Sequence, residues 1–427
     1  MGSIQALRGT RDILPEEVRY WQLLEAIARQ ILDRAAYQEI RPPIFERTEL
    51  FARGIGEATD IVGKEMYTFN DRATPPRSVT LRPEGTAGVV RAYIQNNLYA
   101  SGGVQRLWYT GPMFRYENPQ AGRQRQFHQL GVEVIGSADS RADAEVIAIA
   151  TDILQILGLK NLRLDINSVG NSDDRPRYRQ ALVDYLMPYK DELDPDSQDR
   201  LTRNPLRILD SKDERTKEIV AQAPSILDYL GEDSKRHFEQ VQQLLSNLGI
   251  SYQVNPCLVR GLDYYTHTAF EIISDDLGGQ ATVCGGGRYD GLVQELGGNP
   301  TPAVGWAMGL ERLIILLQQN QEFPRQALDF YVVSRGELAE ARSLILAQKL
   351  RQAGFSVEID LSGSAFKKQF TRADRSGAVA CLILGDEEAQ TQTVQLKWMA
   401  SKEQQAIAIA DLLAKTDELR HQIDSLR

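Results

Sequence analysis

The clearest pattern of hydrophobic and polar positions lies in residues 109–136, YTGPMFRYENPQAGRQRQFHQLGVEVIG. From residue 126 onward the side chains alternate, as they do on the two faces of a β-strand. The positions on the core face are His128, Leu130, Val132 and Val134. The positions on the opposite face are Phe127, Gln129, Gly131 and Glu133. The pattern predicts a strand, a charged loop and a second strand whose polar face forms the floor of a site.

Helical spacing of apolar residues predicts further elements. A helix opens at Pro15, where Glu16 and Glu17 suit its first turn, and an amphipathic helix covers residues 139–157. Pro83 predicts the start of another helix after a strand at 77–81. Strand-like runs also occupy residues 64–70 and 162–169, and the sheet resumes at Ser251 and continues through LVRGLDYYTHTAFEI at 258–272. Residues 302–319 predict a short strand that turns into a helix.

The pattern divides the chain into domains. Residues 171–250 are polar, charge-rich and helical in spacing, which indicates an insertion between two halves of one sheet. After Pro324 strands and helices alternate regularly, as in a small α/β domain. The predicted division is a domain over 1–325, with its insertion at about 171–250, and a second domain over 326–427. The fold class is a multidomain combination of α/β and α+β.

Composition narrows the function classes. The chain has 427 residues, 42% hydrophobic and 25% charged, which is ordinary for a soluble globular protein of two or three domains. It has no signal-peptide or membrane-span pattern, so a cytoplasmic location and no membrane partner are expected. Three cysteines without metal-ligand spacing argue against disulfides and zinc. A net charge of -9 argues against nonspecific coating of nucleic acid, although basic patches could bind a folded RNA.

The loop of the hairpin carries arginines and no lysine. Arg115, Arg123 and Arg125 accompany Glu117, and guanidinium groups hold phosphates in a fixed plane. Gly131 leaves room for a ligand between Gln129 and Glu133. The alternative is a solvated hairpin tip on a wet sheet face.

Three other positions could carry chemistry. Glu84, with Thr86 close by, either caps a helix or receives the amino group of a substrate. Arg260 is followed by Asp263, Tyr264 and Tyr265, polar tips that could line a pocket or lie at the surface. Arg312 lies in the first turn of a helix, where the dipole disfavours a cation unless an anion is near. The glycines at 285–287 match neither a P-loop nor a Rossmann turn, and His267 is not assigned to the chemistry.

The tail carries a run of basic residues around its second strand and helix. They are Lys349, Arg351, Lys367, Lys368, Arg372 and Arg375. Most charge runs are solvated helix faces, but these residues could also contact RNA phosphates.

These peptides together resemble a known family. FRYENPQAGRQRQFHQLGVEVIG is similar to motif 2 of the class II aminoacyl-tRNA synthetases, AVGWAMGLERL to motif 3, and EIRPPIFE to motif 1, the dimer-forming segment. LVRGLDYYTHTAFEI and CGGGRYDGL resemble the two signature peptides of the histidyl-tRNA synthetases, and RGTRDILPEE and RPEGTAG are also similar to that family. The resemblance covers essentially the whole chain.

The resemblance implies an antiparallel six-stranded catalytic sheet with flanking helices, a helical insertion near the tRNA acceptor arm and a C-terminal anticodon-binding domain. It implies a homodimer that joins L-histidine to ATP as histidyl-adenylate, releases pyrophosphate and transfers histidine to the 3′ end of its tRNA. Mg²⁺ would accompany the ATP, and no side chain is assigned to a metal. Asn118 stands at a motif 2 loop position where the family often has arginine, in a loop that touches the acceptor end.

The resemblance also assigns roles to residues. Arg260 and Arg115 would be catalytic, with Arg260 stabilising charge at the α-phosphate. The ATP site would consist of Arg115, Glu117, Arg123, Phe127 and Arg312. The histidine site would consist of Glu84, Gly85, Thr86, Arg115, Gln129, Glu133, Arg260, Tyr264, Tyr265 and Tyr289. Among these, Glu84, Thr86 and Gln129 would receive the α-amino group, and Glu133, Tyr264 and Tyr265 would surround the imidazole.

Two alternatives stay open. A non-catalytic regulatory subunit of ATP phosphoribosyltransferase resembles the same catalytic domain, but it typically lacks the tail domain and has eroded signature peptides. This chain keeps Arg260, Tyr264 and Tyr265 and has a tail. A nucleotide-binding structural protein would fit the composition but would leave the charged residues unexplained.

Overall fold

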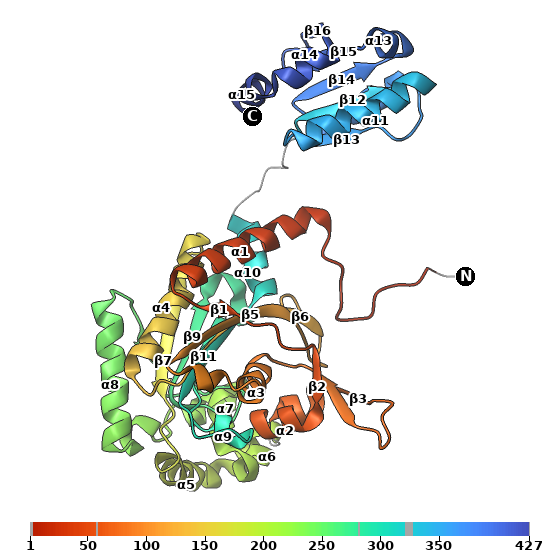
Figure 1. Ribbon diagram of the computed structural model, residues 1–427. Helices are drawn as coiled ribbons and strands as arrows, with labels where there is room; N and C mark the ends of the chain where they lie inside the picture. The colour runs from red at the N-terminus through yellow and green to blue at the C-terminus, as the bar shows by residue number, and fades with distance from the viewer. Residues whose placement is uncertain (1–2, 57–58, 281, 321–327, 427) are drawn as a thin grey trace. The chain divides into compact units, whose positions relative to one another are not determined.

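The computed structural model describes residues 3–56, 59–280, 282–320 and 328–426 (Figure 1). The chain forms two compact units, Met1–Glu322 and Phe323–Arg427. The predicted domain boundary at 325–326 lies outside the described residues. None of the described helices is both long enough and apolar enough to cross a membrane.

The first unit is built on a sheet with the strand order β1-β5-β6-β11-β10-β9-β7-β8. Its six central strands pair antiparallel, as predicted, and a two-residue parallel strand extends each edge. The strands are β1 (Gln38–Glu39), β5 (Gln105–Phe114), β6 (Gln126–Ile135), β7 (Leu162–Ser168), β8 (Gln253–Val254), β9 (Thr266–Ser274), β10 (Thr282–Arg288) and β11 (Ala303–Gly309). The predicted hairpin is confirmed as β5 and β6, with Tyr109 opposite Gly131.

Helices cover one face of this sheet and enclose the main core. They are α1 (Pro15–Arg34), α4 (Ser140–Ile156), α8 (Glu232–Asn247) and α10 (Leu310–Asn320). The core-facing side chains of β6, Leu130, Val132 and Val134, pack into this layer, which confirms the predicted alternation. The indole of Trp306 on β11 donates a hydrogen bond to the backbone oxygen of Val146 at 2.7 Å and so ties α4 to the sheet. The opposite face is left for smaller elements and the site.

A three-stranded sheet with order β2-β4-β3 stands beside that opposite face. The elements there are β2 (Phe45–Arg47), α2 (Thr48–Ile55), the π-helical turn η1 (Ile61–Glu65), β3 (Tyr67–Asn70), β4 (Ser78–Leu81), α3 (Thr86–Gln95), the 3-10 turn η2 (Leu98–Ser101) and α9 (Leu292–Glu295). The strand predicted over residues 64–70 is shorter in the structure, where β3 covers only Tyr67–Asn70. The helix predicted to start at Pro83 begins at Thr86 instead, because the Glu84 carboxylate accepts the backbone N–H groups of Thr86 and Ala87.

The segment between β7 and β8 is helical. It contains α5 (Asp174–Leu186), η3 (Met187–Glu192), α6 (Pro195–Arg203), η4 (Pro205–Asp210), α7 (Glu214–Val220), η5 (Ile226–Tyr229) and α8. The strand predicted within residues 258–272 begins only at Thr266, as β9. Residues 255–265 have neither helix nor strand, so Arg260 and Tyr264 lie in irregular chain beside the insertion. After β9 the chain forms the 3-10 turn η6 (Asp275–Gln280).

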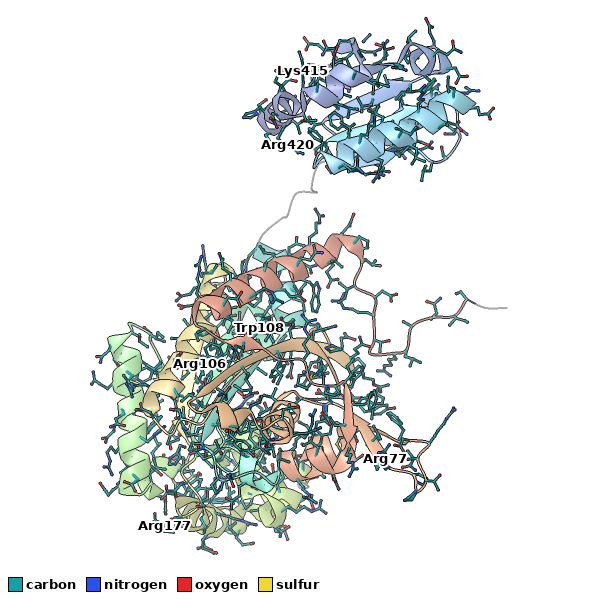
Figure 2. The ribbon with its side chains drawn as sticks, in the orientation of Figure 1. Arg77, Arg106, Trp108, Arg177, Lys415 and Arg420 are labelled. Carbon is teal, nitrogen blue, oxygen red and sulfur yellow. The ribbon has the colours of Figure 1, made fainter. Side chains whose placement is uncertain are left out.

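The second unit is a five-stranded sheet with order β13-β12-β14-β15-β16 and helices around it. β12 pairs parallel with both β13 and β14, whereas β15 pairs antiparallel with both β14 and β16. Its elements are β12 (Phe330–Ser334), α11 (Glu337–Gln352), β13 (Val357–Ile359), α12 (Phe366–Ser376), β14 (Ala380–Leu384), α13 (Asp386–Thr391), β15 (Thr393–Trp398), β16 (Gln404–Ala408), α14 (Ile409–Ala414) and α15 (Thr416–Ser425). Arg420 on α15 contacts Asp329 at 3.1 Å and stacks on Phe355, which fastens this helix to the sheet (Figure 2). The predicted alternation of strands and helices is confirmed, but the sequence pattern did not predict β16 or α13.

A buried ion pair joins the first unit's sheet to its helical layer. Arg288 on β10 is fully buried, and it contacts Asp143 on α4 and the backbone oxygen of Ser137 at 2.7 Å. Burial alone would raise the pKa of Asp143, but the charges and hydrogen bonds of Arg288 and His237 together outweigh it and lower the pKa to about 2. The pair is therefore charged at neutral pH, and each partner depends on the other.

We expect Asp143→Asn to lower the free energy of unfolding by about 3–5 kcal/mol, because it leaves the buried Arg288 guanidinium with only the partly exposed Asp290 as a counter-charge. Calorimetry of the full chain measures the change. Asp233→Asn, which breaks an exposed pair with Arg236 on α8, is the control and should alter the melting temperature little. Equal effects of the two substitutions would contradict a special role for the buried pair.

Candidate functional site

A cavity of about 720 Å³ opens over the sheet face that the helical layer leaves free. The predicted site residues that line it are Glu84, Thr86, Arg115, Glu117, Arg123, Phe127, Gln129, Arg260, Tyr264, Tyr265, Tyr289 and Arg312. Two predicted residues do not line it: Gly85 caps α3, and Glu133 lies fully buried beneath the floor. The fold thus brings together residues from the two sides of the insertion.

Glu133 is held by hydroxyl groups from three separate segments. Thr86 on α3 donates to its carboxyl at 2.7 Å, Tyr109 on β5 donates at 3.4 Å, and Tyr289 after β10 donates a short hydrogen bond. Burial raises the pKa of Glu133 to about 8, although these hydroxyls pull it down. The protonated form of this carboxyl is therefore favoured at neutral pH.

Three glycines pack closely against the side chains of Tyr109 and Glu133. The Tyr109 ring is wedged between Gly85 and Gly131, where a Cβ on either glycine would overlap its atoms. Gly305 on β11 lies opposite Glu133, and a Cβ there would overlap the carboxylate. No residue other than glycine fits at these three positions without moving its neighbours. The space above Gly131 holds the Tyr109 ring, so the prediction that Gly131 leaves room for a ligand is wrong.

The Glu84 side chain satisfies the first backbone N–H groups of α3, although the N-cap residue itself is Gly85. The Glu84 carboxylate accepts from the backbone N–H of Thr86 at 2.7 Å and of Ala87 at 2.9 Å. Burial raises its pKa, while these two donors act in the opposite direction. The capping interpretation of the sequence therefore holds, and the same carboxylate still lines the cavity.

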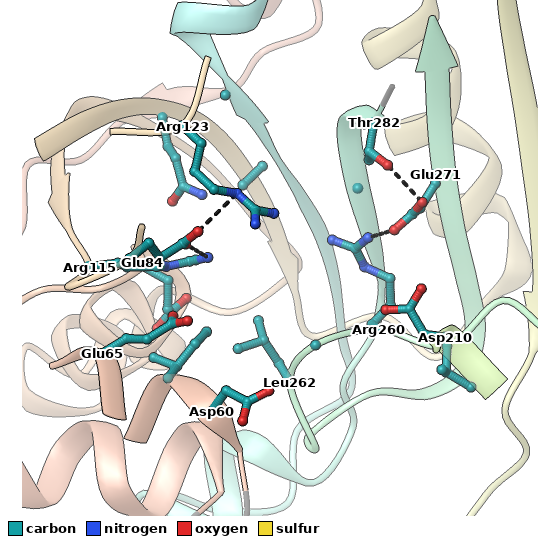
Figure 3. A pocket seen from close by; sticks show the side chains of 18 of the residues that line it. Asp60, Glu65, Glu84, Arg115, Arg123, Asp210, Arg260, Leu262, Glu271 and Thr282 are labelled. Carbon is teal, nitrogen blue, oxygen red and sulfur yellow. Dashed lines mark hydrogen bonds and ion pairs between the residues drawn. The ribbon is translucent and has the colours of Figure 1, made fainter. Parts of the chain in front are cut away.

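One wall of the cavity carries the arginines of the hairpin loop (Figure 3). Glu117 lies between two guanidiniums, at 2.9 Å from Arg123 and 3.8 Å from Arg115. Arg115 also donates to the backbone oxygen of Pro83 at 2.8 Å, and its guanidinium lies 5.2 Å from the ring centroid of Phe127. These contacts fix the direction of the guanidinium groups before any ligand arrives.

Arg312 completes this cationic side from the first turn of α10. Burial lowers its pKa, and the neighbouring Arg123 lowers it further. Arg312 and Arg123 thus add positive charge to this side of the cavity, which suits an anion.

The opposite wall is formed by Arg260 (Figure 3). Its guanidinium makes a short contact with Glu271 on β9, and the other oxygen of Glu271 accepts from the Thr282 hydroxyl at 3.0 Å. Burial would lower the pKa of Arg260, but the facing Glu271 carboxylate and Tyr265 together outweigh it and raise the pKa above its usual value. Arg260 is thus a permanent charge, held in one orientation and aimed across the cavity from Arg115.

Aromatic side chains close the space between these walls. The rings of Tyr264 and Tyr265 lie 4.7 Å apart, and Tyr264 meets Tyr289 edge to face at 5.5 Å. Burial raises the pKa of Tyr264 and Tyr289 well above the usual value, so their hydroxyls stay neutral donors and acceptors.

The sequence interpretation missed several residues of the site. Tyr109 donates a hydrogen bond to Glu133, and Glu271 pairs with Arg260. The positions of Tyr109 and Glu271 follow from strand register rather than from local pattern. The rim contributed by the insertion was also missed; it consists of Asp194, Asp196, Arg200, Arg207, Asp210, Ser211, Lys212 and Asp213. Only the FEI sequence at 270–272 of the first signature peptide offered a signal, because Glu271 lies within it.

Comparison with known proteins assigns the chain to a family. A family model described as histidyl-tRNA synthetase matches residues 9–313, and one described as an anticodon binding domain matches residues 329–419. A histidine–tRNA ligase of Crocosphaera subtropica is 74% identical over 424 residues, which are 99% of this chain and 98% of the relative. The crystal structure of apo S. aureus histidyl-tRNA synthetase is similar with a TM-score of 0.80 and 40% identity, over 96% of this chain and 99% of that one.

A more distant structure shares the fold alone. It is described as an ATP phosphoribosyltransferase regulatory subunit/histidyl-tRNA synthetase from Bacillus halodurans, and its TM-score is 0.65 at 22% identity, over 90% of this chain and 99% of that one. The family model, the full-length relative and the S. aureus structure agree with one another. The chain therefore belongs to the histidyl-tRNA synthetase family.

Proposed function

We propose that this chain is a histidine–tRNA ligase, which activates L-histidine with ATP to histidyl-adenylate and pyrophosphate and then transfers histidine to the 3′ end of its tRNA. One observation carries the proposal: a buried carboxyl surrounded by hydroxyls lies beneath a cavity whose two walls carry fixed guanidinium groups. The first feature suits an imidazole, and the second suits a polyphosphate.

The histidine would lie with its ring toward Glu133. A neutral imidazole has one N–H donor and one acceptor nitrogen, and a carboxyl with neighbouring tyrosine hydroxyls can pair both. Glu84, Thr86 and Gln129 would receive the α-amino group. A side chain without ring nitrogens would leave these buried groups unpaired, which costs binding free energy.

ATP would lie along the wall formed by the hairpin loop. Arg115 would hold the α-phosphate and the histidine carboxylate, while Arg123 and Arg312 would hold the outer phosphates. Phe127 would stack on the adenine. Because Glu117 already orients Arg115 and Arg123, little reorganisation would be needed when the phosphates bind.

Arg260 would stabilise the charge that develops at the α-phosphate as the histidine carboxylate attacks it and pyrophosphate leaves. Glu271 and Thr282 would act as positioning residues, because they hold the guanidinium through one carboxylate. The contribution is electrostatic and preorganised, and no proton moves to or from Arg260.

Mg²⁺ bound to the ATP phosphates would neutralise part of their charge. Such an ion needs only one or two protein carboxylates, since phosphates and water supply its other ligands. Glu65 and Glu117 are two of the carboxylates on that side of the cavity, which also carries Asp60 and Glu84. Burial raises the pKa of Glu65, and the charge of Glu117 adds to the effect.

The second unit would bind the anticodon region of the tRNA, in line with its match to an anticodon binding domain. Of the basic residues predicted to contact RNA, Arg351 donates to the backbone oxygen of Val357, and Arg372 pairs with Asp360. Lys349, Lys367, Lys368 and Arg375 are exposed and could contact phosphates.

A homodimer is also part of the proposal. Ile44 and Phe45, in the segment that resembles motif 1, expose 44% and 59% of their surface, and β2 is an edge strand. An exposed apolar edge of this kind suits contact with a second copy. The cytoplasmic location expected from the sequence stays a prediction.

The regulatory-subunit alternative is not favoured. The relative with 74% identity carries the ligase name over its full length, and the tail domain is present here. Arg260 also keeps its acidic partner and its place in the cavity.

ATP–pyrophosphate exchange with each amino acid in turn tests the function. We expect exchange with histidine alone, followed by charging of histidine tRNA. Histidine binding without any exchange would instead support the regulatory alternative.

We expect Arg260→Ala to lower the rate of adenylate formation by about 10²- to 10³-fold, the effect of removing one preorganised charge donor. Pyrophosphate exchange under saturating ATP and histidine measures it. Arg215→Ala, which removes an exposed arginine of the insertion, serves as the control. Near-normal exchange in the Arg260 variant would exclude the proposed role.

Glu133→Gln should change how stability depends on pH in the absence of ligand. The native carboxyl keeps its proton up to a pH of about 8, whereas the unfolded chain releases it near 4.5, so the wild type loses stability as pH rises between these values. The melting temperature of the wild type should therefore fall relative to that of the variant between pH 5 and pH 8. Glu232→Gln, at an exposed position, should show no such trend, and a constant difference for Glu133→Gln would refute the assignment.

A further inference from the structure

A second cavity, of about 460 Å³, lies between the helical insertion and the irregular segment 259–265. Its charged lining residues are Arg175, Arg179, Arg203, Arg207, Arg260 and Asp263. Four of the five arginines come from α5, α6 and η4 of the insertion. The cavity is therefore strongly cationic within a chain whose net charge is -9.

Acidic neighbours balance only part of this charge. Arg203 pairs with Asp199 at 3.3 Å, and Arg260 pairs with Glu271. The carboxylate of Asp263 accepts from the Asn204 amide at 2.7 Å. Counting only the described part of the chain, no carboxylate forms an ion pair with Arg175, Arg179 or Arg207.

Three guanidinium nitrogens at this cavity are buried and have no hydrogen-bond partner. They are Nε of Arg175, Nη1 of Arg207 and Nε of Arg260. Burial lowers the pKa of Arg175 and Arg207, and more distant carboxylates act in the opposite direction. Asp263 and Glu295 act on Arg175, whereas Asp210 acts more strongly than Asp263 on Arg207. A buried charge with unused donors is unfavourable unless an anion supplies the missing partner.

We propose that this second cavity binds a phosphate group. Guanidinium groups bind phosphate oxygens through paired hydrogen bonds, and Arg175, Arg207 and Arg260 offer unused donors from three directions. Arg179 and Arg203 are exposed at the rim and attract the anion to it. The phosphate comes either from a free anion, such as inorganic phosphate or pyrophosphate, or from the backbone of a bound RNA.

The second cavity is coupled to the first through a shared wall. The residues that line both cavities are Arg207, Val259, Arg260, Leu262 and Tyr265. An anion in the second cavity would give Arg260 a second negative neighbour, in addition to Glu271. It would thereby alter how the Arg260 guanidinium acts in the first cavity.

Crystals of the full chain soaked in tungstate, a heavy phosphate analogue, locate the site by anomalous scattering. We expect a peak in the second cavity beside Arg175 and Arg207, and its loss in Arg175→Gln. Arg175 lines only the second cavity, so anions in the first are not affected. A peak in the first cavity alone would overturn the proposal. Arg179→Gln, at an exposed position, repeats the test without altering a buried residue.

Binding measurements separate the two sources of phosphate. The probes are inorganic pyrophosphate and an RNA hairpin with a single-stranded 3′ end, each titrated against the wild type, Arg175→Gln, Arg179→Gln and the exposed control Arg236→Gln. Loss of one charged contact should weaken binding by about ten- to a hundredfold. For RNA, the slope of log affinity against log salt should also shrink by about 0.7–0.9.

Weaker pyrophosphate binding with unchanged RNA binding identifies a free anion as the occupant. Weaker RNA binding with the smaller salt slope identifies a backbone phosphate. If both affinities in both variants equal those of the Arg236→Gln control, the cavity does not bind phosphate and the proposal fails. Neither arm depends on the ligase reaction.

Discussion

The buried carboxyl of Glu133 is the interaction on which the site depends. Its partners, Thr86, Tyr109 and Tyr289, come from a helix, a neighbouring strand and a loop that are far apart in the sequence. Each hydroxyl that satisfies the carboxyl also fixes the element that carries it. A single polar group thereby sets the relative positions of α3, β5 and the chain after β10, and it does so inside the space where the imidazole is proposed to bind.

A second constraint is the opposition of charged walls across this floor. Arg115 is oriented by Glu117 and a backbone oxygen, and Arg260 is oriented by Glu271. Both guanidiniums are held by carboxylates rather than by water, so the field in the cavity exists before a substrate enters. The helical layer beneath, fastened by the pair of Arg288 with Asp143, provides the rigid support that this arrangement needs.

Local pattern was sufficient to predict the hairpin and most helices, because alternation and helical spacing are properties of neighbouring residues. The set of site residues came mainly from the resemblance to the histidyl-tRNA synthetases, and all of them except Gly85 and Glu133 line the cavity. It failed where a side chain overrides the local signal: Pro83 is typical of a first helical turn, but the Glu84 carboxylate delays the helix to Thr86. Tyr109 and Glu271 were missed because their roles require the strand register. The second cavity was beyond prediction, since it needs the insertion to fold back onto the segment after β8.

The glycines of the floor limit how this pocket can change. Gly131 and Gly85 enclose the Tyr109 ring, and Gly305 lies against Glu133, so even one methyl group at any of them collides with the network below. Variation can reach the pocket only from its walls, by shortening side chains such as Tyr264. An altered amino-acid preference would therefore have to evolve by loss of atoms, and such a pocket admits new ligands more readily than it excludes the original one.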